Sequence, residues 1–143
     1  MSTMERRDWL SILARAPHDE LVARAGPFAE PHDVLRAPEI GSVMVRGRVS
    51  GTGAPFNLGE MTVTRCSVDV AGVVGHGWVQ GRSAPAARAA ALLDAAMQGA
   101  RAAEVARDVL EPILEARTAR AASRAAKAEA TVVDFFTLVR GED

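Results

Sequence analysis

The sequence predicts an α+β fold with a small antiparallel sheet of three to four strands, an N-terminal helical pair and long alanine-rich C-terminal helices. Two patterns support this prediction. Between residues 42 and 80, apolar and polar side chains alternate, as they do in half-buried strands. Before and after this region, apolar side chains recur every three or four residues, which is typical of amphipathic helices. The 143 residues fit one domain with a single core.

Charge and composition exclude several classes of partner. The net charge is -1, from 17 basic and 18 acidic residues, so no whole-molecule field attracts nucleic acid or a membrane surface. Any bound anion must therefore be met by local groups. Cys66 is the single cysteine and cannot form an internal disulfide, and the first residues lack the apolar segment of a signal peptide. No apolar run approaches the roughly 20 residues of a membrane helix. We therefore expect a soluble, cytoplasmic protein.

The N-terminal region predicts two short helices. Ser2 and Glu5 have the spacing of a capping box, and an apolar stripe at helical spacing follows them. Trp9 lies in this stripe, so we expect it to be a core residue rather than a ligand platform. A second helix is predicted to begin near Pro17 and to end at Gly26.

Residues 28–41 have no regular pattern, apart from the short run Val34-Leu35, which fits an edge strand. His18 and His32 lie in or just before this segment. Neither has a cysteine, histidine or carboxylate set at ligand spacing. We therefore interpret them as surface histidines and predict no metal site.

The predicted sheet consists of residues 42–50, 60–70 and 73–80. The apolar positions of the second strand change parity along its length, and a bulge near Thr64-Arg65 is the simplest explanation. A tight turn joins the second strand to the third, and we expect this hairpin to be the centre of the sheet. One face of the third strand is rich in glycine, which leaves room for another backbone or an aromatic ring.

A long glycine-rich connection joins the first two predicted strands. It begins with Gly51, Thr52 and Gly53, whose flexible backbone allows close approach to a ligand. This segment lacks both the GxxxxGK[ST] and the GxGxxG patterns, so it is only a weak phosphate-loop signal. A glycine-rich hairpin loop is the alternative interpretation.

The end of the third strand meets the start of a helix at Gly81-Arg82-Ser83. Ser83 is the predicted N-cap, so the free backbone N–H groups of the helix start lie near Arg82, and with its guanidinium they are the ingredients of an anion site. Arg65 would add a second guanidinium if the predicted bulge turned it the same way. The alternative is a capped helix with two surface arginines. The residues of this anion- or partner-facing corner are Thr64, Arg65, Trp78, Gln80, Arg82 and Ser83.

The C-terminal third predicts helices that extend away from a compact body. An apolar stripe reaches Ile113, and Pro112 fits the first turn of a new helix. Residues 115–131 contain alanine, charged and hydroxyl side chains but no large apolar one, so this helix stands in solvent or packs on another chain. We therefore expect a compact part at about residues 1–111 and a helical arm with an apolar tail over residues 112–143.

The tail combines apolar side chains that would be costly to leave in water, at roughly 1.5 to 3 kcal/mol for each large side chain. We predict that it docks, and the polar alanine-rich spacer before it makes a partner or a swapped second copy of the chain as plausible a site as the chain's own body. The predicted interface residues are Val132, Val133, Phe135, Phe136, Leu138, Val139 and Arg140.

Catalytic groups are hard to assemble from this sequence. Cys66 lies in the middle of a strand, the serines lack a GxSxG elbow, and His76 is more simply a packed strand residue than a base. For Asp94, an ion pair with Arg88 or Arg101 is as plausible as a role in chemistry. The catalytic residues therefore stay unknown, and the chain is interpreted as a binding or assembly subunit.

Five motifs occur in order: GTGAPF, TRCSV, GHGWVQGR, AALLDAAMQ and VDFFTLVRG. Together they resemble the PhnG subunit of the bacterial phosphonate carbon–phosphorus lyase system, over most of the chain. The resemblance implies a cytoplasmic complex with PhnI, PhnH and PhnJ subunits and a PhnL-type ATPase. In that complex, ribose 5-triphosphate is transferred from ATP to a phosphonate with release of adenine, and ATP is a co-substrate. No cofactor is implied for this chain itself. A helical adaptor or homodimerisation protein is the alternative.

Overall fold

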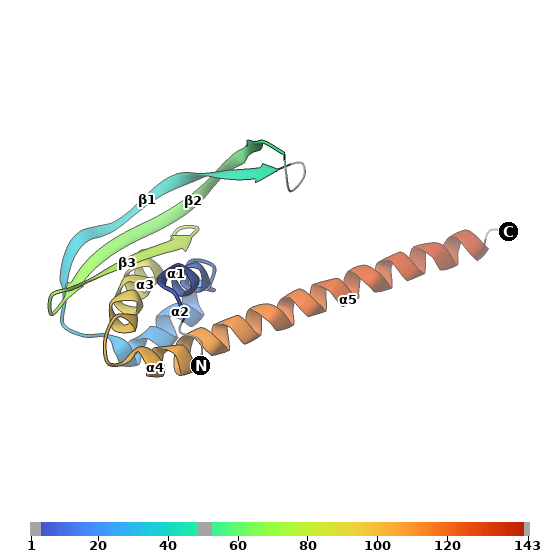
Figure 1. Ribbon diagram of the computed structural model, residues 1–143. Coiled ribbons are helices and arrows are strands. Elements are labelled where there is room, and N and C mark those ends of the chain that lie inside the picture. The colour runs from blue at the N-terminus through green and yellow to red at the C-terminus, as the bar shows by residue number, and fades with distance from the viewer. Residues whose placement is uncertain (1–3, 49–52, 142–143) are drawn as a thin grey trace.

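The computed structural model describes residues 4–48 and 53–141, and side chains as far as Glu129 (Figure 1). The elements in chain order are α1 (Arg6–Ala14), α2 (His18–Ala25), the 3-10 turn η1 (Gly26–Phe28), β1 (Asp33–Arg48), β2 (Pro55–Val70), β3 (Val73–Gln80), α3 (Ala84–Met97), α4 (Ala102–Val105), the π-helix η2 (Ala106–Leu110) and α5 (Glu111–Gly141). The predicted α+β class, the N-terminal helical pair and the long C-terminal helix are confirmed.

The sheet is antiparallel with the order β1-β2-β3, so the predicted central position of the β2–β3 hairpin is wrong. Strand β2 is central, because it pairs with both β1 and β3, and β1 is one strand of 16 residues rather than two short pieces. Pro38 lies inside β1 at a register shift between Arg36 and Glu39. A proline is tolerated at an irregularity of an edge strand, because no ladder hydrogen bond is required of it there.

The predicted bulge at Thr64-Arg65 is also wrong. Both residues pair with β3 without interruption, Thr64 opposite Val79 and Arg65 opposite Trp78. The change of parity arises because Thr64 occupies a core position with a hydroxyl side chain, on the same face as Cys66. The irregularities of the sheet lie instead in the β1–β2 pairing.

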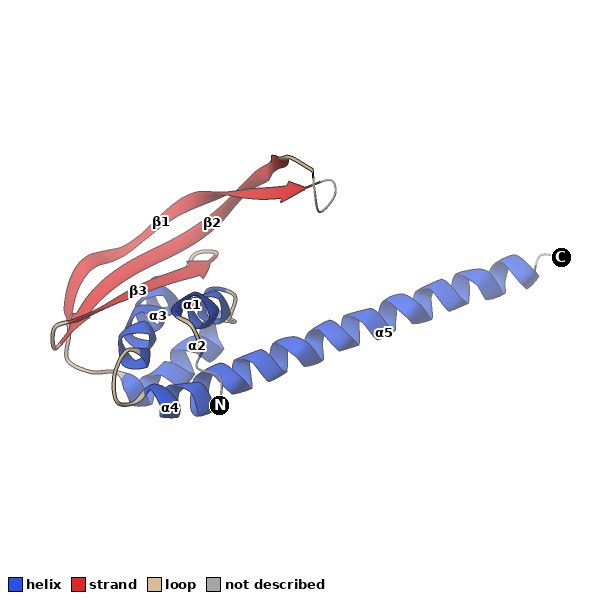
Figure 2. Cartoon of the chain, in the orientation of Figure 1, coloured by secondary structure: helices blue, strands red, loops and turns tan. Residues whose placement is uncertain are grey.

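Helices α1, α2 and α3 lie on one side of the sheet (Figure 2), and the core lies between them and strands β2 and β3. The closest contact is between α3 and β3. A Cβ built on Gly75 would be 2.0 Å from the carbonyl oxygen of Ala91, and one built on Gly77 would be 2.1 Å from that of Ala87. The glycine-rich face of β3 therefore accommodates a helix backbone, as the sequence predicted.

Helix α1 begins later than the capping-box pattern suggested. Its N-cap is Glu5, which forms a reciprocal capping box with Asp8. Ser2 lies outside the described residues. The predicted core residues of this helix are buried, namely Trp9, Ile12, Leu13 and Ala16.

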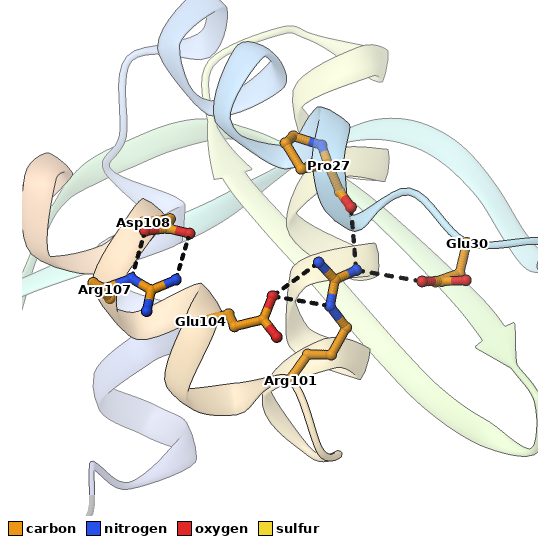
Figure 3. Close-up of polar contacts among 6 residues, drawn as sticks. All are labelled: Pro27, Glu30, Arg101, Glu104, Arg107 and Asp108. Carbon is orange, nitrogen blue, oxygen red and sulfur yellow. Dashed lines mark hydrogen bonds and ion pairs between the residues drawn. The ribbon is translucent and has the colours of Figure 1, made fainter.

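Arg101 connects the start of α4 to the segment that leads into β1 (Figure 3). It donates to the backbone oxygen of Pro27 at 3.1 Å and to the carboxylate of Glu104 at 3.0 Å. Its guanidinium also lies 4.4 Å from the ring centroid of Phe28. Arg101 is therefore committed to this junction and does not pair with Asp94.

The C-terminal segments α4, η2 and α5 run on as one helix that leaves the body (Figure 1). Pro112 lies in the first turn of α5, as predicted. The carbonyl of Asp108, four residues earlier, cannot receive a hydrogen bond from the proline and accepts one from Arg24 at 3.2 Å. Ile113 is the last buried side chain of the described part, and every side chain from Thr118 to Glu129 is exposed.

A second projection is formed by the far ends of β1 and β2. Strand β3 ends at Gln80, opposite Val63, so residues 41–48 and 55–62 continue as a two-stranded ribbon (Figure 1). Several large apolar side chains on and beside this ribbon are exposed, namely Ile40, Met44, Phe56 and Leu58. No helix within the described residues is long and apolar enough to span a membrane.

Candidate functional site

In the predicted corner, two hydroxyl side chains form hydrogen bonds with the backbone of the turn between β3 and α3. Thr64 is 1% exposed, and its Oγ1 donates to the carbonyl of Gly81 at 2.8 Å and accepts from the backbone N–H of Ser83 at 3.1 Å. Ser83 is the N-cap of α3, as predicted, and its Oγ accepts from the backbone N–H of Ala86 at 3.1 Å. Gly81 has a φ of 84°, a conformation that favours glycine. Thr64 and Ser83 therefore hold the turn between β3 and α3.

Of the other four predicted corner residues, Arg65 is half-buried and the rest are exposed, and the four do not gather at one point. Gln80 ends β3, and its carbonyl accepts a hydrogen bond from His18 Nε2 at 2.7 Å. Arg82 extends from the turn and has no hydrogen bond or ion pair with any other residue that the structure describes. Arg65 and Trp78 face away from the helices, because successive residues of a strand point to opposite faces and Thr64 faces the core.

Arg65 and Trp78 belong to a polar cluster on the outer face of the sheet, the face without helices. We call it the outer-face cluster. It has two rows across the three strands, Glu39–Arg65–Trp78 and Arg36–Ser67–His76. Five of its side chains line a shallow hollow of about 380 Å³, namely Arg36, Arg65, Ser67, His76 and Trp78.

Two guanidinium groups meet at one carboxylate in this cluster. Arg36 and Arg65 both donate to the same oxygen of Glu39, Oε1. The guanidinium of Arg65, and to a smaller extent that of Arg36, holds the pKa of the Glu39 carboxyl below its usual value. Arg65 also lies 5.7 Å from the ring centroid of Trp78, within cation–π range. The cluster is therefore held in place by its own contacts.

The pKa of Glu39 gives a direct test of this geometry. We expect Arg65→Gln to raise the pKa of Glu39 toward the usual value of 4.5, because the largest cause of its depression is removed. In the wild type, the interactions of the ionised Glu39 carboxylate stabilise the folded protein at pH values above the usual pKa of a glutamate. This stabilisation is lost as the pH falls through the lowered pKa of Glu39 in the folded protein. A carboxyl-carbon NMR titration measures the shift. Arg15→Gln, an exposed arginine on the helical side, is the control. An unchanged Glu39 titration in Arg65→Gln would contradict the contact.

Ser67 and His76 form the second polar pair of the cluster, with Ser67 Oγ hydrogen-bonded to His76 Nδ1 at 2.8 Å. A serine beside an imidazole is the beginning of a nucleophile–base pair. However, no carboxylate of the described residues is hydrogen-bonded to this histidine ring, so the third member of a triad is missing. The pair therefore offers hydrogen-bonding groups to the hollow rather than a formed catalytic triad.

Sequence reasoning missed Arg36, Glu39 and Ser67. Arg36 and Glu39 lie roughly 30 residues before Ser67 in the chain, and only the register of β1 against β2 brings them together. That register contains shifts near Pro38, which could not be counted from the sequence.

Asp94, singled out by the sequence, has a structural position. It is fully buried and accepts four hydrogen bonds, from Arg6 Nη2 at 2.6 Å and Nε at 3.2 Å, from Trp9 Nε1 at 2.8 Å and from the backbone N–H of His76 at 2.8 Å. The predicted partners of Asp94, Arg88 or Arg101, are wrong. The carboxylate joins α1, α3 and β3, and all of its acceptor capacity is used within the fold.

The remaining candidates for chemistry are also occupied or buried. Burial raises the pKa of the Cys66 thiol, an effect that the guanidinium of Arg88 offsets in part. His18 and His32 are each hydrogen-bonded to a backbone carbonyl oxygen. No group of three histidine, cysteine or acidic side chains that could hold a metal ion occurs within the described residues.

Two predicted surfaces lie wholly or partly outside the described residues and side chains. Gly51 and Thr52 lie outside the described residues, and Gly53 lies in a bend just before β2. The predicted interface residues between Val132 and Arg140 lie on the helical backbone of α5, but their side chains are beyond the described part. Docking by this tail stays a prediction.

Two comparisons with known proteins agree with each other. Residues 4–141 match the family described as "Phosphonate metabolism protein PhnG". The PhnG subunit of alpha-D-ribose 1-methylphosphonate 5-triphosphate synthase from Rhizobium meliloti (strain 1021) is 42% identical to this chain over 142 residues, which cover 97% of this chain and 91% of that protein. The resemblance carried by the five sequence motifs is therefore confirmed, and the chain belongs to the PhnG family of phosphonate metabolism proteins.

Proposed function

We propose that this chain is a subunit of the carbon–phosphorus lyase core complex and assists its alpha-D-ribose 1-methylphosphonate 5-triphosphate synthase step. In this step, ribose 5-triphosphate passes from ATP to a phosphonate and adenine is released. The observation that carries the proposal is the 42% identity, over 97% of the chain, to a protein named as a subunit of that synthase. The complex acts in the cytoplasm, with ATP as its co-substrate.

The geometry supports a subunit role rather than catalysis by this chain alone. The thiol of Cys66 and the carboxylate of Asp94 are buried, and Asp94 is committed to Arg6 and Trp9. The Ser67–His76 pair has no carboxylate partner within the described residues. A complete catalytic centre for nucleotide cleavage would therefore require groups from other subunits.

Two projections support assembly with other chains. Helix α5 extends beyond its last described buried residue, Ile113, with only exposed side chains from Thr118 to Glu129. Among the described residues, neither a third strand nor a helix runs along the ribbon of residues 41–48 and 55–62 (Figure 1). An isolated two-stranded ribbon is marginally stable in water, so packing on another surface would stabilise it. We propose PhnI-, PhnH- and PhnJ-type subunits and a PhnL-type ATPase as the partners, with Arg82 directed toward a partner or an anion.

The test is native mass spectrometry of this chain co-expressed with a PhnI-type protein. We expect a stable hetero-complex for the full chain and its loss when residues 132–143 are removed, because the apolar tail is predicted to dock there. Removal of residues 142–143 alone is the matched control and should leave the complex intact. Circular dichroism should show an unchanged melting of the body in both truncations, since the core ends at Ile113 in the described part.

The alternative, a helical adaptor or homodimerisation protein, predicts a different spectrum. The chain would then form a homodimer and would not bind the PhnI-type protein, whether or not residues 132–143 are present. A hetero-complex that persists without residues 132–143 would leave the subunit role standing but would overturn docking by the tail.

A further inference from the structure

We propose that the outer-face cluster is a binding site for a small molecule that carries a phosphonate or phosphate dianion. The inference rests on the proposed function for its choice of ligand. It goes beyond that function by assigning the ligand to residues of this chain. The cluster differs from the predicted corner, since of the corner residues it includes only Arg65 and Trp78.

The first argument is an excess of hydrogen-bond donors. Each guanidinium carries five N–H groups, yet Arg36 and Arg65 share one oxygen of Glu39. The other N–H groups of the two arginines therefore remain available, and both side chains are about half exposed, at 50% and 42%. Within the two rows of the cluster, two arginines against one glutamate leave a charge of about +1 at neutral pH. The hollow therefore favours an anion.

The second argument is the shape of the donor set. Arg36 comes from β1, Arg65 and Ser67 from β2, and His76 from β3, so donors from all three strands surround the hollow. A carboxylate presents two oxygens in one plane, whereas a phosphonate presents three oxygens in a tetrahedral arrangement. Two guanidinium groups with a hydroxyl and an imidazole can satisfy the larger set, as arginine does in many phosphate sites.

The third argument is the wall of the hollow. Trp78 is 41% exposed and lies beside the guanidinium of Arg65. An exposed indole beside a cation provides an apolar surface for the organic part of a ligand and a charged group for its anionic part. The neighbouring row, Asp33–Asp69–Val74, is acidic and confines an anion to the arginine side of the hollow.

The test is a titration of the full-length chain followed by nitrogen–proton NMR, including the indole and guanidinium Nε signals. The probes are methylphosphonate, inorganic phosphate and ATP, with acetate as the carboxylate control. We expect saturable shifts at the outer-face cluster for at least one phosphorus anion and none for acetate. The relative affinities of methylphosphonate and ATP identify which of the two provides the dianion.

Variants make the test specific. Arg36→Gln and Arg65→Gln should each weaken binding by about tenfold or more, because each removes a charge-assisted hydrogen-bond donor. Arg15→Gln, an exposed arginine on the helical side, should bind as the wild type does. The absence of saturable shifts, equal binding by the glutamine variants, or equal shifts with acetate would overturn the proposal.

Assembly is measured on the same variants and separates this proposal from the proposed function. A complex that forms normally while no anion binds would overturn the site and leave the subunit role in place. Anion binding by a chain that forms no complex would support the site and overturn the subunit role. Loss of the complex in Arg36→Gln and Arg65→Gln, without anion binding by the wild type, would make the outer-face cluster a protein interface and overturn the ligand site.

Discussion

Replacing Asp94 with alanine is expected to lower the free energy of unfolding by about 3 kcal/mol or more, because removal of one member of a buried charged network leaves the others unpaired. The buried donors left behind are the indole N–H of Trp9 and the backbone N–H of His76. Arg6 contributes less to the loss, since its side chain is 41% exposed and water can replace part of its pairing. The effect is measured by urea denaturation.

Two further variants separate the charge from the hydrogen bonds. Asp94→Asn keeps one acceptor oxygen and the same shape, so it should be destabilised less than Asp94→Ala. Asp108→Asn removes an exposed carboxylate that pairs only with its neighbour Arg107 among the described contacts, and it should change stability by less than about 0.5 kcal/mol. Equal stabilities of wild type and Asp94→Ala would show that α1 is held to the sheet by apolar packing alone.

Local patterns in the sequence were sufficient to predict the helices and the α3 cap. Helical spacing placed Trp9 in the core, and the Gly-Arg-Ser turn placed Ser83 at the helix start. These features depend on residues that are close in the chain. The contacts of Asp94 could not be predicted in this way, since Arg6 lies 88 residues earlier, whereas Arg88 and Arg101 lie close to Asp94 in the chain.

The predicted corner was also wrong where it depended on more than local sequence. Thr64 and Arg65 are consecutive, so in a regular strand they must face opposite sides of the sheet. The prediction brought them together with a bulge, but β2 is regular at this point against β3. Thr64 therefore turns inward to bind Gly81 and Ser83, whereas Arg65 turns outward to Glu39.

The outer-face cluster depends on the irregular part of the sheet. Between Arg36 and Glu39, three steps along β1 match two steps along β2. With this extra residue in β1, Arg36 pairs with Ser67 and Glu39 pairs with Arg65. The side chains of Arg36 and Glu39 also form a hydrogen bond with each other. The sequence contains Pro38 as a sign of irregularity, but a proline alone does not specify how many residues a register shift contains.

Replacing Gly77 with alanine is expected to lower the free energy of unfolding by about 3 kcal/mol or more, at the upper end of the effects of overpacking. A Cβ at this position would lie 2.1 Å from the carbonyl oxygen of Ala87 and 2.6 Å from the backbone nitrogen of Ala91. Both are backbone atoms of α3, so no side chain can move aside and the helix itself must separate from β3. Urea denaturation measures the loss.

Gly41→Ala is the matched control for Gly77→Ala. Gly41 also lies in a strand, but a Cβ built there has no heavy atom within 4 Å and its φ is not in the region that favours glycine. Alanine should therefore be neutral or stabilising by up to about 1 kcal/mol, because it restricts the unfolded chain. If both variants were equally stable, the contact between β3 and α3 would have to be looser than 2.1 Å implies. If Gly77→Ala alone unfolds, the glycine-rich motif of this strand is required because the backbone of a helix lies directly on it.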